Sequence, residues 1–266
     1  MQAKDLAGVK HWDSIYQRSI SSIRPGWRPK NYTELTLEHI LLGEIKRAKA
    51  KTILEVGCGN STWLSHIAKC TGAKVTGIDY SEDGCHLARE RLRLEQIPAE
   101  VHCLDLFDTK ALSIGQFDFV YSLGVVEHFS DLDAVLAALL QFVKPGGFLL
   151  SEVPNLCSVH GLLSWIWQPK LLAMHMPLNK KRLMRSYRDL NLQNIRGYYR
   201  GFFSLNVVNW QKHPRWPSIA TRLLPSIRKF VYFTDRYFFR KIPTFHGVPI
   251  FAPYIYAIGE KPRRAI

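Results

Sequence analysis

Short apolar runs alternate with longer amphipathic stretches through the first 155 residues of this 266-residue chain. The short runs have the length and apolar character of buried strands, whereas the longer stretches repeat apolar residues at helical spacing. Strands are predicted at 53–56, 74–79, within 99–107, at 117–122 and at 148–153, and helices at 11–16, 33–48, 62–68, 82–94 and 133–143. Strands that alternate with helices predict an α/β fold.

Beyond residue 155 the alternation is less regular. The expected elements are an apolar helix within 155–167, a basic helix that begins near 175–179, and strands at 194–203 and 251–259. An insertion at 204–250 separates these two strands and carries one predicted helix, 226–242. We predict a single domain made of a preface (1–34), a core (35–155), a basic aromatic cap with the sixth strand (156–250), and the last strand with its tail (251–266).

Charge divides the chain at the same place. Residues 1–155 hold 17 Lys and Arg against 19 Asp and Glu, whereas residues 156–266 hold 19 Lys and Arg against 3 acids, a net charge of +16. Such a surface favours an anionic partner: a membrane surface, a phosphorylated substrate or nucleic acid. Basic residues surround one apolar face of the helix at 226–242, which fits either a membrane interface or a lid packed on the core.

Neither a membrane span nor a signal peptide is predicted, since no run approaches the roughly 18 apolar residues of a span and the first residues lack a cleavage pattern. The five cysteines are odd in number and have no Cys-x-x-Cys spacing. Reduced thiols are therefore expected, with neither a disulfide scaffold nor a zinc site. We predict a cytoplasmic protein that could touch the inner membrane face through 226–242.

A glycine-rich turn joins the first core strand to its helix, in the sequence Ile53-Leu54-Glu55-Val56-Gly57-Cys58-Gly59-Asn60-Ser61-Thr62. Such a turn presents backbone N–H groups to a nucleotide-like ligand, and its glycines let the ligand approach closely. A dinucleotide-binding turn wants a glycine at position 62, where Thr stands. Glu55 places a charge at an apolar strand end, where it needs a partner. A tight turn that binds nothing remains an alternative at this point.

The pattern acidic-x-Gly-x-Gly resembles the first motif of the class I S-adenosylmethionine-dependent methyltransferases. The resemblance implies a Rossmann-like, seven-stranded, mostly parallel sheet with helices on both faces, and S-adenosylmethionine as the cofactor. It also implies that an acid and the turn hold the methionine part of the cofactor, here Glu55, Gly57, Cys58, Gly59, Asn60 and Ser61. The family often has a further glycine where Ser61 stands.

Further segments match the family in order. Asp79 ends the second strand, where a carboxylate can accept hydrogen bonds from both ribose hydroxyls, although a simple strand-end cap is the alternative. After the third strand, Asp105 matches the acid that bonds the adenine amino group and Leu106 the apolar residue on the ring. The family also shares a fourth strand that leads into Leu123-Gly124-Val125-Val126-Glu127-His128-Phe129, and the turn Lys144-Pro145-Gly146-Gly147. The remaining candidates for cofactor contact are Tyr80, Leu123 and, in the N-terminal helix, Tyr16.

His128 is the main catalytic candidate because it follows the carboxyl end of the fourth strand. A neutral imidazole there could accept the proton of a hydroxyl that attacks the methyl group. A structural role, in which His128 caps a helix or fixes the loop over the cofactor, is weighed equally. Glu127 is expected to face solvent or else to orient His128. His175 is a second base or substrate-binding candidate against a loop-anchoring role, and no metal is predicted.

These features predict O-methylation of a small-molecule, sugar or lipid-linked glycan hydroxyl, by in-line transfer of the methyl group. The basic second half motivates an anionic substrate. An RNA methyltransferase would also be basic, but no RNA-binding module is recognisable, so nucleic acid is not expected as a partner. A non-catalytic protein of the same fold, or a nicotinamide oxidoreductase, would also carry a glycine-rich turn after its first strand. The oligomeric state does not follow from the sequence.

Overall fold

The structure is a computed structural model that describes residues 3–18, 23–201, 204, 229 and 247–263. The helix predicted at 226–242 lies outside these residues except for Lys229, and so does its predicted membrane contact. Within the described part of the chain, no helix combines the length and the apolar character needed to cross a membrane.

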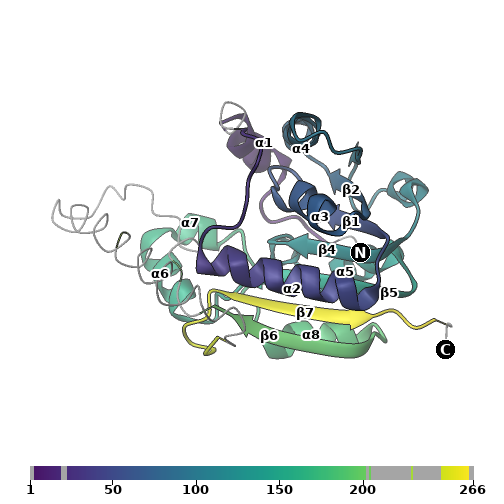
Figure 1. Cartoon of the computed structure of the whole chain (residues 1–266). Coiled ribbons are helices and arrows are strands. Elements are labelled where there is room, and N and C mark those ends of the chain that lie inside the picture. Colours follow the sequence, from purple (N-terminus) through teal and green to yellow (C-terminus); the bar gives the residue numbers. More distant parts are fainter. Residues whose placement is uncertain (1–2, 19–22, 202–203, 205–228, 230–246, 264–266) are drawn as a thin grey trace.

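Seven strands form one sheet in the described residues, in the order β3-β2-β1-β4-β5-β7-β6 (Figure 1). The first five strands of this order are parallel, and β7 lies antiparallel to both β5 and β6. The predicted seven-stranded, mostly parallel sheet is confirmed. The strands span β1 (Thr52–Val56), β2 (Lys74–Asp79), β3 (Glu100–Cys103), β4 (Phe117–Leu123), β5 (Val143–Pro154), β6 (Gln193–Arg200) and β7 (Tyr254–Glu260).

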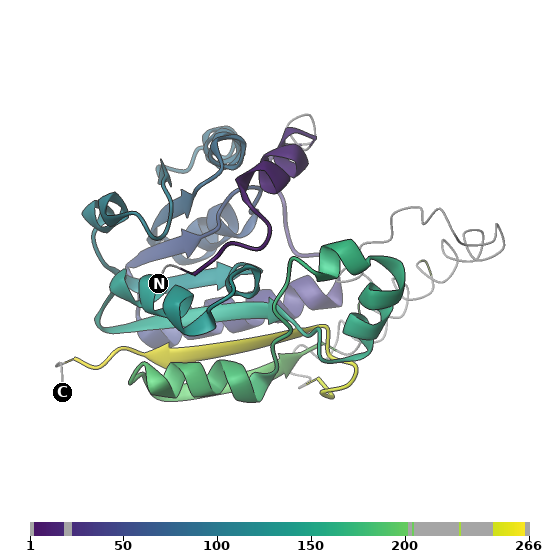
Figure 2. The same cartoon turned by 180° about the vertical axis from the view of Figure 1, so that it is seen from behind.

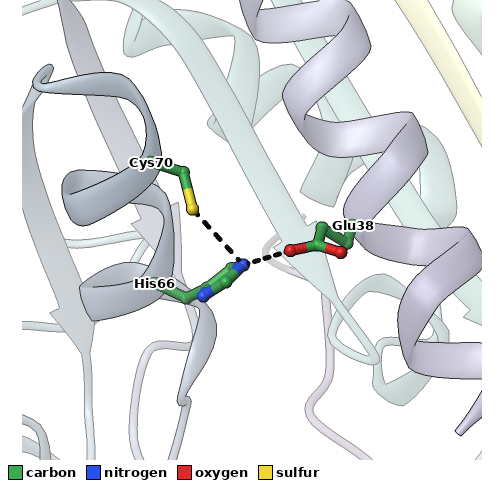
Figure 3. Close-up of side chains that lie close together, drawn as sticks. All are labelled: Glu38, His66 and Cys70. Carbon is green, nitrogen blue, oxygen red and sulfur yellow. Dashed lines mark hydrogen bonds and ion pairs between the residues drawn. The ribbon is translucent and has the colours of Figure 1, made fainter. Parts of the chain in front are cut away.

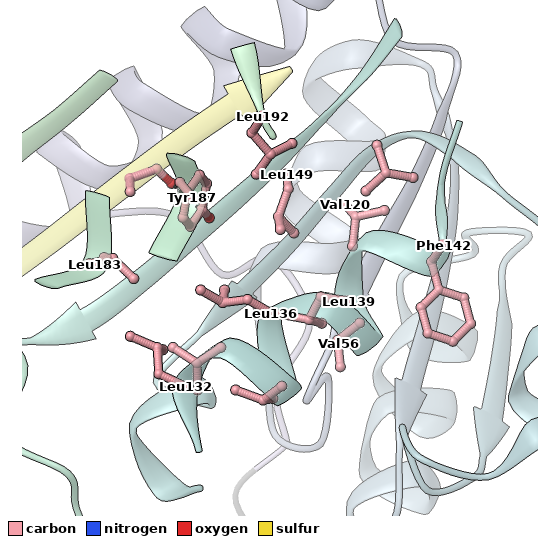
Figure 4. Close-up of a cluster of buried hydrophobic side chains, with 14 of the residues drawn as sticks. Val56, Val120, Leu132, Leu136, Leu139, Phe142, Leu149, Leu183, Tyr187 and Leu192 are labelled. Atoms are coloured by element: carbon pink, nitrogen blue, oxygen red, sulfur yellow. Dashed lines mark hydrogen bonds between the residues drawn. The ribbon is translucent and has the colours of Figure 1, made fainter. Parts of the chain in front are cut away.

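Helices cover both faces of the sheet because successive strand residues point to opposite sides. One face packs on α2 (Tyr32–Ala48), α3 (Trp63–Thr71) and α4 (Glu82–Leu94) through a core that includes Leu41, Ile53 and Ile67. The other face packs on α5 (Leu132–Gln141) and α8 (Lys180–Asp189), which lie together on the opposite side of the molecule (Figure 2). Figure 4 shows this second core, in which Leu136 and Tyr187 meet strand residues such as Val120.

Most of the remaining helices lie around the carboxyl end of the sheet, whereas the 3₁₀ helix at 109–114 leads into the beginning of β4. The remaining helices are α1 (Val9–Gln17), α6 (Val159–Trp167), α7 (Pro169–Leu172) and two short 3₁₀ helices, Thr109–Ile114 and Val126–His128. Side-chain caps explain several helix starts: Asn31 accepts from the Glu34 N–H in a capping box, and Ser81 accepts from the Gly84 N–H.

Four predicted boundaries are wrong. The helix predicted to reach residue 143 ends at Gln141, and the predicted turn at 144–147 lies inside β5, which begins at Val143. A register shift opposite β4 accommodates it, and Gly147 lies so close to that strand's backbone that a Cβ would be 2.9 Å from the Asp118 carbonyl oxygen. The last strand begins at Tyr254 instead of residue 251, and β6 ends at Arg200 instead of residue 203.

Helix α8 belongs to the sheet's helical layer, although we expected residues 156–190 to form part of a cap. Leu183 and Tyr187 of this helix are fully buried. The Tyr187 hydroxyl donates to Ser151 Oγ at 3.0 Å. The basic residues of α8 therefore occupy only the outer side of an amphipathic helix.

Candidate functional site

A cavity of about 360 Å³ lies at the carboxyl ends of β1, β2 and β4. Its wall includes Gly57 after β1, Asp79 at the end of β2 and Leu123 at the end of β4. The strand order reverses between β1 and β4, and parallel α/β sheets bind ligands at such a switch point. The fold therefore brings the predicted motifs from separate parts of the sequence to one place.

The glycine-rich turn lies where only glycine fits. Gly57 has φ +79°, and a Cβ added there would overlap the side chain of Val125. A Cβ at Gly59 would overlap the hydroxyl of Tyr16 and lie 3.0 Å from Asp79 Oδ2. Tyr16 thus lies over the turn and lines the cavity, while its contact with the cofactor stays a prediction. Burial raises the pKa of Tyr16, so its hydroxyl stays protonated.

Asp79 is buried, and its position is compatible with both roles weighed for it. Its carboxylate accepts from the N–H of Gly59 and the N–H of Ser81, both at 2.9 Å, so it caps the strand end. It also lines the cavity, where the free lone pairs of its oxygens can accept ligand hydroxyls. Burial raises the pKa of Asp79, while these two backbone N–H groups counteract the rise.

Asp105, Leu106 and Tyr80 also line the cavity. The Asp105 carboxylate accepts from the N–H of Phe107 at 2.9 Å, which fixes the loop after β3. Leu106 and Phe107 add apolar wall beside this acid. An acid next to an apolar surface matches a ligand with a polar-edged, flat ring. The contact of Asp105 and Leu106 with adenine stays a prediction.

Glu55 is not among the described residues that line the cavity. It lies beneath the turn, 1% exposed, and its Oε2 accepts from the Tyr121 hydroxyl at 2.8 Å. Burial raises the pKa of Glu55 to about 8. Cys58, Gly59, Asn60 and Ser61 do not belong to the described lining either. Their contact with the cofactor stays a prediction. The Cys58 carbonyl accepts from the Ser61 N–H at 2.9 Å and Ser61 Oγ accepts from the Trp63 N–H at 3.0 Å, and these hydrogen bonds hold the turn in shape.

The N-terminal segment closes one side of the cavity, and of its residues only Tyr16 was predicted to contact the cofactor. Asp5 forms an antiparallel bridge with Phe129 and accepts from the Tyr80 hydroxyl at 2.7 Å. Trp12 lines the cavity as well, and its ring packs edge-on against His128 at 5.0 Å between centroids. Local spacing cannot mark these contacts, because they join residues distant in the chain and depend on the orientation of α1.

A second cavity, of about 220 Å³, adjoins the first, and Gly124 and His128 line both. The Nδ1 of His128 lies 2.9 Å from the carbonyl oxygen of Met174. A carbonyl only accepts, so Nδ1 carries the proton and Nε2 keeps its lone pair. Burial, together with the neighbouring His175, lowers the pKa of His128 to about 4. The imidazole is therefore neutral near pH 7.

Glu127 and His175 meet His128 in the second cavity. Glu127 is 2% exposed, so the expectation that it faces solvent is wrong. Burial raises its pKa to about 8, and its Oε1 lies 4.0 Å from His128 Nε2. The His175 ring lies 4.3 Å from that of His128, and its Nδ1 donates to the Leu171 carbonyl at 2.8 Å. One ligand atom from each of the three residues falls within 4.8 Å of the others, a separation that one cation could bridge.

Comparison with known proteins identifies the core of the chain. Residues 53–147 match the family described as "Methyltransferase domain". A ubiquinone biosynthesis O-methyltransferase of Aromatoleum aromaticum is 36% identical over 105 residues, which are 40% of this chain and 44% of the relative. The corresponding protein of Chromobacterium violaceum is 32% identical over 105 residues, 40% of this chain and 45% of the relative. The chain thus spans less than half the length of the curated relatives it matches.

Solved structures share the fold across nearly the whole chain. The putative methyltransferase in complex with the Trm112 activator of Haloferax volcanii has a TM-score of 0.62 at 14% identity, over 99% of this chain and all of that one. The plantazolicin methyltransferase BpumL, solved with a substrate analogue and S-adenosylhomocysteine, has a TM-score of 0.59 at 18% identity, over 97% of this chain and 96% of that one. At these identities the likeness establishes the fold.

The residues present fit S-adenosylmethionine. The turn at Gly57 and Gly59 has no room for side chains, Asp79 and Asp105 supply acceptors at the ends of β2 and β3, and Leu106 supplies an apolar wall. These groups suit a ligand that carries hydroxyls and a flat polar ring. With the matched family and the shared fold, the conclusion is that this chain carries a class I, Rossmann-like S-adenosylmethionine-dependent methyltransferase domain, for which S-adenosylmethionine is the cofactor.

Proposed function

We propose that this protein methylates a hydroxyl of a small molecule and that His128 accepts the proton of that hydroxyl. One observation carries the proposal: His128 lines both the cavity that fits the cofactor and the adjoining cavity of about 220 Å³. The smaller cavity is then the acceptor site. A group placed between the two cavities can reach an oxygen that attacks across their boundary.

The cofactor supplies, when bound, a methyl group on a positively charged sulfur that is intrinsically reactive. The protein aligns the acceptor oxygen with that methyl group and keeps water out. The His128 Nδ1–H bond to Met174 fixes the ring and leaves Nε2 to take the proton as the oxygen forms its bond to carbon. Neutral Glu127 lies on the acceptor side, where its carboxyl can donate to a second oxygen of the acceptor.

The acceptor class follows from the same residues. A pKa of about 4 makes His128 a weak base, so an acidic hydroxyl such as a phenol suits it better than an aliphatic alcohol. The name of the curated relatives, ubiquinone biosynthesis O-methyltransferase, agrees with a small-molecule acceptor. Sugar and lipid-linked glycan hydroxyls are the alternative acceptors. The second half of the chain is strongly basic and could hold an acceptor that carries a negative charge.

The test is a methyl-transfer assay with labelled S-adenosylmethionine against phenolic, sugar and lipid-linked acceptors and an RNA pool. Transfer to RNA alone would favour an RNA methyltransferase, and an absence of transfer with cofactor binding intact would favour a non-catalytic protein. His128→Ala should lower kcat by roughly 10²–10⁴-fold. Its affinity for S-adenosylhomocysteine should change little. His39→Ala, at an exposed histidine on α2, is the matched control.

Turnover that His128→Ala leaves at the wild-type level would refute the base. The less disruptive His128→Gln guards against a folding defect, since it keeps a polar side chain in the same space. The wild-type rate should be flat from about pH 5 to pH 7, because a base with a pKa of about 4 is already deprotonated there. The rate should fall below about pH 4 as His128 gains a proton, and fall again near pH 8 as Glu127 loses the proton that it donates to the acceptor.

We predict that methyl transfer needs no metal ion. The alternative is that Glu127, His128 and His175 of the second cavity bind one cation, and a chelator distinguishes the two. Activity that survives EDTA supports a base at His128. Activity that EDTA abolishes and one divalent cation restores would replace the base by a metal held by Glu127, His128 and His175.

A further inference from the structure

A second cluster of metal-binding side chains lies away from the two cavities, between α2 and α3. It consists of Glu38 from α2 and of His66 and Cys70 from α3 (Figure 3). His66 and Cys70 are four residues apart on one helix, so their side chains share a face. The His66 side chain is 9% exposed and the Glu38 side chain 26% exposed, whereas Cys70 is exposed. One ligand atom from each falls within 4.8 Å of the others.

Both neighbours of the imidazole converge on the same ring nitrogen. His66 Nε2 lies 2.6 Å from Glu38 Oε1 and 3.6 Å from Cys70 Sγ. A catalytic Cys-His-acid arrangement instead places the acid on one ring nitrogen and the sulfur on the other. With protons alone, Nε2 can donate well to only one of these neighbours, since it carries at most one hydrogen. Three ligand atoms around one point are the arrangement that a cation needs.

The distances fit zinc. Zinc–nitrogen bonds of about 2.0–2.1 Å and zinc–sulfur bonds of about 2.3 Å at a tetrahedral angle separate nitrogen and sulfur by about 3.5 Å, close to the observed 3.6 Å. The oxygen would need to lie about 3.4 Å from the nitrogen, about 0.8 Å farther than it does. A small rotation of the partly exposed Glu38 side chain supplies that change.

The surroundings hold the imidazole and leave an entrance. The rings of Trp27 and Trp63 pack edge-on against His66, at 5.6 and 5.9 Å between centroids, and fix its orientation. Exposed Cys70 opens the cluster to solvent, which provides an entry path for the ion and room for a water as the fourth ligand. The sequence showed no zinc spacing because the third ligand comes from another helix.

We propose that Glu38, His66 and Cys70 bind one zinc ion that joins α2 to α3. The site is separate from methyl transfer and does not depend on the proposed function. The zinc ion would have a structural role. Helix α3 begins directly after the glycine-rich turn, and a metal bridge to α2 would hold α3 in place.

The experiment uses the untagged, metal-free full chain, titrated with zinc against a competing chelator dye. Wild type should take up one zinc, and Cys70→Ser should lose at least tenfold in affinity, because a hydroxyl is a poorer zinc ligand than a thiolate. Cys157→Ser, at another exposed cysteine, is the matched control and should keep wild-type affinity. Cobalt should give a sulfur-to-metal absorption band that Cys70→Ser lacks and Cys157→Ser retains.

A further variant distinguishes zinc bound by this cluster from zinc bound by Glu127, His128 and His175 in the second cavity. His175→Ala should keep the zinc, and a tenfold loss there would assign the ion to the other cluster and overturn the proposal. Failure of wild type to bind zinc, or wild-type affinity in Cys70→Ser, would also overturn it. Zinc at about a hundred times its dissociation constant should raise the wild-type Tm by about 5 °C or more. S-adenosylhomocysteine binding by Cys70→Ser reports that the variant is folded.

Discussion

Replacement of Glu127 by Gln tests the electrostatics of the second cavity. The Glu127 side chain is 2% exposed, and its Oε2 is buried without a hydrogen-bond partner among the described residues. Burial, with a smaller contribution from the negative charge of Glu152, raises its pKa from 4.5 to about 8. Gln has nearly the same shape and is neutral at every pH, so Glu127→Gln removes the titration while preserving the packing.

The expected magnitude follows from the pKa difference between the folded and unfolded chain. A rise from 4.5 to about 8 corresponds to about 5 kcal/mol, at about 1.4 kcal/mol for each pKa unit. Because the folded state holds this proton more tightly, its contribution is complete below pH 4.5. It is lost progressively as the pH rises to about 8. Glu127→Gln should therefore resemble wild type near pH 5 and become more stable than wild type toward pH 8.

Urea unfolding at several pH values between 5 and 8.5 measures this difference. The gap in free energy of unfolding between variant and wild type should widen by about 1 kcal/mol or more per pH unit. Glu100→Gln, at an exposed site, is the control and should follow the wild-type profile. A gap that stays constant with pH would refute the reasoning, because it would mean that Glu127 is ionised throughout, as it would be beside a bound cation.

Two further predictions concern the turn and the core. Gly59→Ala should weaken S-adenosylhomocysteine binding at least tenfold in calorimetry, since its Cβ would overlap Tyr16 and crowd Asp79. Unchanged affinity would show that the turn has room for a side chain. In the same assay, binding of NAD by the wild type would contradict S-adenosylmethionine as the cofactor. Leu136→Ala should lower the free energy of unfolding by about 2–5 kcal/mol because its fully buried side chain fills the core of Figure 4. Leu112→Ala, at an exposed position, should cost much less, and equal losses would contradict the assigned core.

The sequence by itself determined the fold class and the cofactor-binding edge of the sheet. Apolar runs and helical periodicity are local consequences of which face each element buries, so strands and helices of the first half could be predicted. The turn at Gly57 and Gly59, Asp79 and Asp105 sit at the ends of strands that the pattern already placed. In a parallel sheet these ends meet at one edge, so their meeting followed from strand order.

Element boundaries depended on contacts that no local pattern records. Residues 144–147 are strand because the neighbouring strand β4 and a register shift accommodate them, although Pro-Gly-Gly favours a turn. Trp12 lines the cavity beside His128, a contact between residues distant in the chain. Both outcomes were set by tertiary partners that override local propensity.

Only the tertiary structure decided the chemistry of the site. Burial set the protonation of Glu127 and His128, and burial is a property of the packed chain that their sequence positions do not reveal. The loop at 174–176 brought His175 onto His128, through a hydrogen bond from the Met176 N–H to the Glu127 carbonyl at 2.6 Å. Glu38 likewise reached His66 from another helix. Sequence motifs are local, so they could be recognised from the sequence alone. The pKa values and the clusters of ligand side chains depend on neighbours that are distant in sequence, so they required the tertiary structure.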